Sequence, residues 1–119
     1  MTRVLLVEDH ALFRQVLSVL LCRYPQMEVM QAGTLAEARL HLGGVDVVAL
    51  GSNFPDGAGT DLIDDVRTNN PGASVLFLKE APDRAICQSA LAAGADSVLS
   101  KVESPFTIVD EIKLLGGAS

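Results

Sequence analysis

Short runs of apolar residues alternate along the chain with longer segments in which apolar residues recur every three or four positions. The short runs fall at Val4–Val7, Met27–Gln31, Val45–Leu50, Val75–Leu78 and Ser97–Ser100. Such runs, bounded by turn residues, are typical of strands in a sheet that is covered on both faces. The sequence therefore predicts five strands, and the more polar runs at 27–31 and 97–100 indicate strands at the periphery of the sheet.

The segments between the runs have the 3.6-residue period of amphipathic helices. Helices are predicted at Ala11–Tyr24, from Thr34 to Gly43-Gly44, at Thr60–Asn69, at Pro82–Ala93, and from Ser104-Pro105 to Gly116-Gly117. The residues of the first helix that are expected to face the core are Phe13, Val16, Leu17, Leu20 and Leu21. Thr34 and Glu37 form a capping box at the start of the second helix, and Gly94 is the expected stop of the fourth.

Strict alternation of strands and helices predicts an α/β protein with a parallel sheet and right-handed crossovers. The expected strand order is 2-1-3-4-5, which makes a flavodoxin-like (βα)5 sandwich with helices on both faces. The first and last helices then cover one face, and the three middle helices cover the other. Cys22 and Cys87 fall on opposite faces, so we expect no disulfide between them and interpret both as small apolar core residues.

Composition narrows the class of protein. The 119 residues favour one domain, and 49% of them are hydrophobic, which is enough for a substantial core. A formal net charge of −6 without a basic stripe argues against direct contact with nucleic acid. No apolar run approaches the roughly 20 residues of a membrane span, and Met1-Thr2-Arg3 leads into a strand without a signal-peptide pattern. Two cysteines without motif spacing indicate a reducing compartment, so we expect a cytoplasmic domain away from membranes.

Residues that follow the strands are expected to meet at one edge of the sheet, because the carboxyl ends of parallel strands form the crevice where sites are built. They are Glu8-Asp9 after the first strand, Gly51 after the third, Lys79 after the fourth and Lys101 after the fifth. Gly51 carries no side chain at the place where a chemical group is expected. Asn53 lies in the loop that follows, and Pro55-Asp56-Gly57 is a predicted turn in that loop.

Four stretches together carry a family pattern: Val4-Leu5-Leu6-Val7-Glu8-Asp9-His10, Phe54-Pro55-Asp56-Gly57, Ala92-Ala93-Gly94-Ala95-Asp96, and Lys101. They resemble the receiver domain of bacterial two-component response regulators, and the resemblance covers the whole chain. The phrase at Val7–Arg14 is most similar to the NarL/FixJ-like subfamily, in which a helix-turn-helix domain that binds DNA usually follows the receiver. In receivers, an aspartate at the end of the third strand accepts a phosphoryl group, and two acids after the first strand help to hold Mg²⁺. A lysine after the fifth strand and a serine or threonine after the fourth contact the phosphoryl oxygens.

The resemblance implies that the acceptor position falls on Gly51, which has no nucleophile and is not phosphorylatable. Lys79 takes the serine or threonine position, and Val98 takes the position of an aromatic residue in the fifth strand. The sequence thus predicts a degenerate phosphorylation pocket, without cofactor or bound metal, whose residues are Glu8, Asp9, Gly51, Asn53, Lys79 and Lys101. We further predict that the Lys79 ammonium group approaches Asp9 or Glu8 and occupies the space of the missing acceptor and metal.

Simpler interpretations exist for each of these residues. Glu8 and Asp9 could be solvated acids at a helix start, where the macrodipole favours them, and Lys79 and Lys101 could be exposed loop lysines. Gly51 could be a tight-turn glycine. Asp56 and Ser52 are conceivable substitute acceptors, although Asp56 is more simply the turn residue, and His10 is interpreted as a helix-entry residue.

Three functions stay open at this point. The first is an atypical, phosphorylation-independent receiver that signals through protein contacts as a homodimer and regulates a C-terminal helix-turn-helix output domain in transcription control. The second is a ligand-sensing domain whose vacated pocket binds a small molecule. The third, a flavin or phosphate-processing enzyme, is disfavoured because the chain has no Gly-rich phosphate loop and no nucleophile paired with a base. We expect one receiver-like domain over residues 1–119, with 116–119 as the start of a linker.

Overall fold

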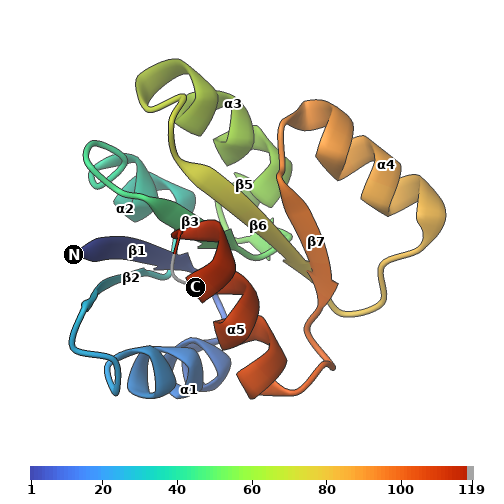
Figure 1. Ribbon diagram of the computed structural model, residues 1–119. Coiled ribbons are helices and arrows are strands. Elements are labelled where there is room, and N and C mark those ends of the chain that lie inside the picture. The colour runs from blue at the N-terminus through green and yellow to red at the C-terminus, as the bar shows by residue number, and fades with distance from the viewer. Residues whose placement is uncertain (118–119) are drawn as a thin grey trace.

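The computed structural model describes residues 1–117 and shows strands and helices alternating along the chain (Figure 1). The strands are β1 (Thr2–Val7), β2 (Met27–Ala32), β3 (Val47–Leu50), β4 (Asn53–Phe54), β5 (Gly57–Ala58), β6 (Ser74–Lys79) and β7 (Ser97–Ser100). The helices are α1 (Ala11–Leu21), α2 (Leu35–Arg39), α3 (Gly59–Asn69), α4 (Arg84–Ala93) and α5 (Pro105–Leu115).

The main sheet has five parallel strands in the order β2-β1-β3-β6-β7. This order is the predicted 2-1-3-4-5, since β4 and β5 form a separate two-stranded ribbon. The chain is therefore a flavodoxin-like α/β sandwich, as the sequence predicted. In such a fold the crevice lies beyond the carboxyl ends of β1 and β3, where the strand order reverses.

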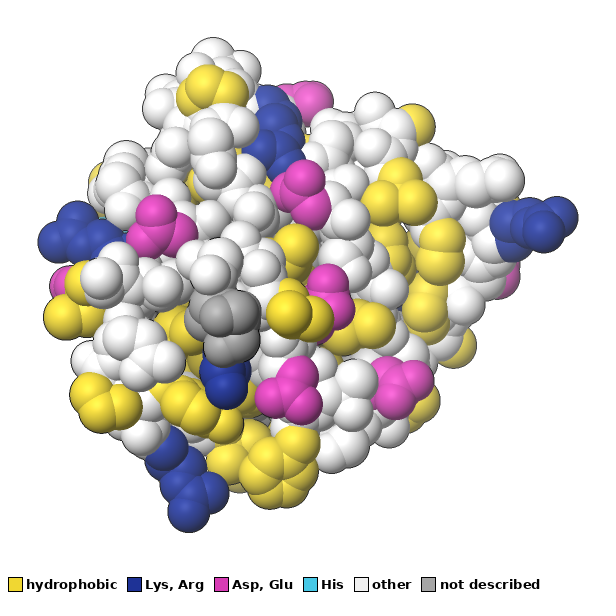
Figure 2. Space-filling model, viewed as in Figure 1, with side chains coloured by type: hydrophobic (Ala, Val, Ile, Leu, Met, Phe, Trp, Pro, Cys, Tyr) yellow, Lys and Arg dark blue, Asp and Glu magenta, His cyan; other side chains and the backbone are white. Residues whose placement is uncertain are grey.

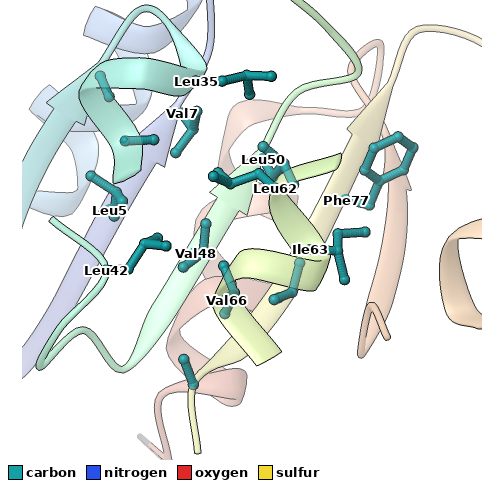
Figure 3. Close-up of a cluster of buried hydrophobic side chains, with 14 of the residues drawn as sticks. Leu5, Val7, Leu35, Leu42, Val48, Leu50, Leu62, Ile63, Val66 and Phe77 are labelled. Atoms are coloured by element: carbon teal, nitrogen blue, oxygen red, sulfur yellow. The ribbon is translucent and has the colours of Figure 1, made fainter. Parts of the chain in front are cut away.

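Two layers of buried side chains sandwich the sheet. On one side, residues of β1 and β3 such as Leu5 and Val48 pack against α2, α3 and α4 (Figure 3). On the other, alternate residues of the same strands, such as Leu6, pack against α1 and α5. Side chains of a strand point alternately to the two faces, and this alternation decides which cleft each residue near the strand ends can reach.

Three local features differ from the predictions. In α1, Ser18 is buried and Val16 is exposed, because the Ser18 hydroxyl accepts a hydrogen bond from the Gln31 amide of β2 (3.2 Å). Helix α2 has five residues and stops well before Gly43. The following segment is held out of helical geometry by the Asn70 side chain, whose amide donates to the carbonyls of Leu42 (3.0 Å) and Val45 (2.9 Å).

The third difference is the β4–β5 ribbon, which closes around the predicted Pro55-Asp56-Gly57 turn. Phe54 lies buried beneath it and belongs to the core cluster of α2 and α3. None of the helices within residues 1–117 combines the length and the apolar character needed to cross a bilayer.

Candidate functional site

The carboxyl ends of β1, β3, β6 and β7 bring the predicted site residues to one edge of the sheet, as expected. A cleft of about 360 Å³ opens there, and its walls are Asp9, His10, Ser52, Asn53, Lys79, Glu80 and Lys101. Glu8 is buried beneath the cleft, 2% exposed, and bonds to Lys101, which is one of the residues in the cleft wall. All six predicted residues therefore gather in one place. Their arrangement, however, is set by a pair that sequence reasoning did not anticipate.

That pair is Glu8 and Lys101. The Lys101 Nζ donates to Glu8 Oε1 at 2.6 Å, and the side chains are only 14% and 3% exposed. The second carboxylate oxygen of Glu8 accepts from the backbone N–H of His10 (2.7 Å), and the ammonium group also lies 5.0 Å from the centre of the Phe13 ring. Both charges are thus paired inside the protein, and the carboxylate is held in a fixed orientation.

The Glu8 carboxylate occupies the space above Gly51. A Cβ built on Gly51 lies in overlap with Glu8 Oε1 and 3.3 Å from its carboxyl carbon. Gly51 is not among the glycines with positive φ, so its backbone accommodates any residue and it is not a tight-turn glycine. A side chain at position 51 is therefore opposed by Glu8, while the backbone itself offers no obstacle.

Lys79 does not take this place, so the predicted approach of its ammonium group to Asp9 or Glu8 is wrong. The Lys79 side chain makes no ion pair with any residue in 1–117. For Glu8, the reason is the alternation along β6: Phe77 faces α2–α4, Leu78 faces α1 and α5, and Lys79 returns to the side of Phe77. Glu8 and Lys101 continue the faces of Leu6 and Leu99, which belong to the α1–α5 side.

The loop from β3 to α3 is tightly folded back on itself. The Gly59 N–H donates to the Ser52 carbonyl at 2.8 Å, and a Cβ on Gly59 would overlap the Gly51 carbonyl. Asp56, at the tip, accepts from the backbone N–H groups of Leu35 and Ala36 at 3.0 Å each. These two bonds hold the pKa of the Asp56 carboxyl below its usual value.

Asp56 is therefore a cap for α2, which argues against its being a substitute phosphoryl acceptor. Thr34 caps the same helix by accepting from Glu37 N–H (3.1 Å), as predicted, while Glu37 returns to the Thr34 hydroxyl (3.4 Å) and not to its backbone. His10 is the cap of α1 and accepts from Phe13 N–H through Nδ1 (3.2 Å), which agrees with its interpretation as a helix-entry residue.

The side chains do not fit the Mg²⁺ ion that receivers use. Mg²⁺ needs several oxygen ligands at once, whereas Glu8 is engaged by Lys101 and position 51 offers no side-chain oxygen. Asp9 is left as the one predicted ligand that remains available. Residues 1–117 also contain no cluster of three or more histidine, cysteine or acidic side chains suited to a metal ion.

Sequence reasoning missed His10, Ser52 and Glu80 as walls of the cleft, and it missed the Glu8–Lys101 contact. The signal for that contact was present, because counting strand positions places Glu8 and Lys101 on one face of the sheet and Lys79 on the other. No comparable pattern in the sequence indicated that Ser52, which lies in the β3–α3 loop, would line the cleft.

The comparisons with known proteins agree with the fold. Residues 4–113 match the profile described as "Response regulator receiver domain". The chain is 31% identical over 119 residues to the DNA-binding transcriptional activator DevR/DosR of Mycobacterium tuberculosis, covering 98% of this chain and 55% of that protein. It is 30% identical over 118 residues to the transcriptional regulatory protein MctR of Rhizobium johnstonii, covering 97% and 55%. The chain thus spans about half the length of these relatives.

Solved structures show the same likeness. The signal receiver domain of the putative response regulator NarL from Mycobacterium tuberculosis matches with a TM-score of 0.86 and 27% identity, over 99% of this chain and 98% of that one. A CheY-like receiver domain protein from Methanospirillum hungatei matches with a TM-score of 0.88 and 22% identity, over 98% and 94%. The second match supports the fold alone, because its sequence identity is low.

Proposed function

Since this chain belongs to the response regulator receiver domain family, we propose that it is an atypical member that works without aspartyl phosphorylation. The observation that carries the proposal is the pair of residues at the acceptor position. Gly51 has no nucleophile, and the carboxylate of Glu8, paired with Lys101, fills the space that an aspartate side chain would need. The pocket is thereby held in one arrangement, so the domain acts as a binding module and not as an enzyme.

The proposed role is control of transcription through an attached output domain. DevR/DosR is described as a DNA-binding transcriptional activator and MctR as a transcriptional regulatory protein, and each is about twice as long as the matched region. We propose that residues from Gly116 onward begin a linker to a helix-turn-helix domain; Ala118 and Ser119 lie outside the described residues. In this proposal the receiver works in the cytoplasm and contacts neither DNA nor membrane.

We include homodimerisation in the proposal, with α1 as part of the contact. Leu12 and Val19 on its outer side are 71% and 63% exposed, and with Val16 and Leu20 they line one apolar hollow along this helix. Hydrophobic side chains reach the surface over the part of the molecule where α1 and α5 lie (Figure 2). A two-fold arrangement that sets α1 against α5 of a second copy would cover these side chains together with the exposed Phe106 and Leu114 of α5.

Light scattering after size exclusion measures the association. We expect a dimer for the wild type at high protein concentration, and a monomer for Leu12→Glu with an unchanged circular dichroism spectrum. Leu40→Glu is the matched control, because Leu40 is 80% exposed but lies on the opposite side of the sheet. Equal masses for the wild type and Leu12→Glu would contradict the role of α1.

Intact mass spectrometry tests the central proposal. After incubation with Mg²⁺ and acetyl phosphate, the mass of the wild type should stay unchanged. Gly51→Asp alone should not restore normal signalling, because Glu8 occupies the space and Lys79 replaces the serine or threonine. The triple variant Glu8→Asp/Gly51→Asp/Lys79→Thr shortens the obstructing side chain, supplies an acceptor and restores the hydroxyl group, so it serves as the positive control. A stable gain of one phosphoryl group by the wild type would refute the proposal.

A further inference from the structure

A second cleft adjoins the first one and differs from it in character. Its volume is about 300 Å³, and it shares Ser52, Asn53 and Lys79 with the first cleft. Beyond these three residues, its floor is Phe77 from β6 and its far wall is α4. Volumes of this size lie at the lower end of the range for pockets that bind small molecules in proteins.

The wall that α4 contributes to this cleft consists mainly of small residues. Ala85, Ser89 and Ala90 line the wall together with Ile86, and Ala90 is the one buried residue of α4. The result is an apolar hollow between β6 and α4, at the β7 edge of the molecule where α4 lies (Figure 1).

Lys79 supplies the one charge in the wall of this cleft. Its side chain has no ion pair and no hydrogen bond with the residues from 1 to 117, although it is half-buried. No acidic residue lines this cleft, whereas Asp9 and Glu80 both line the neighbouring one. A half-buried ammonium group without a counter-charge, beside an apolar floor, favours an anion that carries an apolar body.

The polar groups at the rim fit such a ligand. Ser52, Thr60 and Ser89 bring hydroxyl groups and Asn53 brings an amide to the lining of the same cleft as Lys79, and each of these groups is a hydrogen-bond donor. Ala85 and Ile86 offer apolar surface to the rest of the ligand, while Phe77 and Ala90, both almost fully buried, close the bottom of the cleft. Many small-molecule sites share this division, in which an apolar surface gives affinity and a few polar groups fix orientation.

We propose that the cleft between β6 and α4 binds a small amphipathic carboxylate, with the carboxylate at Lys79 and the apolar body against Ala85 and Ile86. The inference rests on the proposed function. In a receiver that is not phosphorylated, the residue at the end of β6 does not have to contact a phosphoryl group and is available to bind a ligand. Binding joins the end of β6 to α4 and to the β3–α3 loop, so occupancy would order the same edge of the sheet that carries the degenerate pocket.

Chemical shifts of the backbone amides of the 119-residue chain during titration with octanoate test this proposal. We expect saturable shifts for residues of α4 and the end of β6, with a Kd of roughly 0.1–3 mM for an open cleft and a ligand of this size. Octylammonium has the same apolar body with the opposite charge, and acetate has the charge without the body. Each should bind at least about tenfold more weakly than octanoate.

Three variants separate the two halves of the site. Lys79→Gln removes the charge and should weaken octanoate binding about tenfold, and Ala85→Leu fills the apolar hollow and should weaken it similarly. Lys113→Gln is the matched control, because Lys113 stacks over Tyr24 on the opposite face, 4.0 Å from the ring centre, and its loss should leave binding unchanged.

Several results would overturn the inference: no shifts with octanoate up to about 10 mM, equal binding by octylammonium, or wild-type affinity for Lys79→Gln. These outcomes are distinct from failure of the proposed function, which intact mass with acetyl phosphate reports by itself. If the chain is not phosphorylated and does not bind octanoate, the proposed ligand site is contradicted, while the proposal of a phosphorylation-independent receiver is unaffected.

Discussion

Two residues compete for one volume at the centre of the site. Glu8 Oε1 overlaps the Cβ that any residue other than glycine would carry at position 51. The carboxylate that Lys101 contacts is therefore supplied by β1 in this chain, and not by β3. Because Glu8 and Lys101 are both largely buried, changing which residue supplies this carboxylate should alter the stability of the domain as well as the chemistry of the site.

A double-mutant cycle measures this competition. Gly51→Asp should lower the free energy of unfolding by roughly 1–3 kcal/mol, because it overpacks the space and adds a second carboxylate. Glu8→Ala/Gly51→Asp should be more stable than the sum of the single changes by about 1 kcal/mol or more, because Asp at 51 then has both room and Lys101. The measurement is urea unfolding, and Ser52→Asp, on the half-exposed neighbour, is the control. Additive costs would show that the two positions do not share space.

At the scale of elements, the β3–α3 loop and α2 form one unit. Helix α2 has only five residues, and the Asp56 carboxylate from the β4–β5 ribbon accepts from its first two N–H groups. A short helix contributes little stability by itself. The loop that carries Ser52 and Asn53 is therefore anchored at its tip by the helix that it caps.

This anchor predicts a pH dependence. The pKa of Asp56 is lowered from the usual 3.8 by the N–H groups of Leu35 and Ala36, while the unfolded chain keeps the usual value. The stabilisation is thus fully present above the unfolded pKa and is lost as the pH falls through the lower, folded pKa. The measurement is urea unfolding from about pH 7 to about pH 3. At neutral pH the wild type should have a higher free energy of unfolding than Asp56→Ala, and this difference should become smaller toward about pH 3. A constant difference would contradict this role.

The fold followed from sequence because each core strand is a continuous apolar run, and such runs occur where both faces are covered. The gathering of Glu8, Gly51, Lys79 and Lys101 followed from the parallel arrangement alone. What failed for the pair of Lys79 and Glu8 was orientation, because the prediction considered charge and length and ignored the opposite faces to which the two strands direct these side chains. The β4–β5 ribbon could not be foreseen, since two-residue strands leave no periodicity to detect.

At the scale of the whole molecule, the end of the sheet opposite the site is held by one arginine. Arg67 of α3 donates to the carbonyl of Gly94 through Nε (3.0 Å) and Nη2 (2.6 Å), and to that of Ala73 through Nη1 (2.5 Å). Nη2 also contacts the Asp96 carboxylate at 2.7 Å, which in turn accepts from Val75 N–H. One side chain thus joins α3 to the segments that lead into β6 and β7.

Removal of this arginine should destabilise the domain without altering the site. We expect Arg67→Met to lower the free energy of unfolding by about 2–4 kcal/mol, because several partly buried carbonyls and a carboxylate lose their donor. Arg67→Lys should recover only part of the lost free energy of unfolding, since an ammonium group does not reproduce the planar set of N–H donors of the guanidinium group. Denaturant unfolding gives the comparison, and the exposed Arg84→Met is the control. A cost below that of the control would show that the network is dispensable.

The winding of the chain also keeps its two cysteines apart. Cys22 follows α1 and Cys87 lies in α4, on opposite faces of the sheet, and both are free. Cys22 is exposed and Cys87 half-buried, so neither is the core residue that the sequence suggested. Thiol titration in denaturant without reductant should count two thiols per chain. A monomeric disulfide would contradict the winding.

The Glu8–Lys101 contact has a consequence for timing. A receiver that is switched by a phosphoryl group responds as fast as that group is added and removed. Under the proposed function, a pocket held by this ion pair is not switched by adding and removing a phosphoryl group, so those rates do not set its response time. The strength of the output then follows the number of molecules in the cell and the supply of any ligand. Its response time becomes that of synthesis, degradation and dilution by growth.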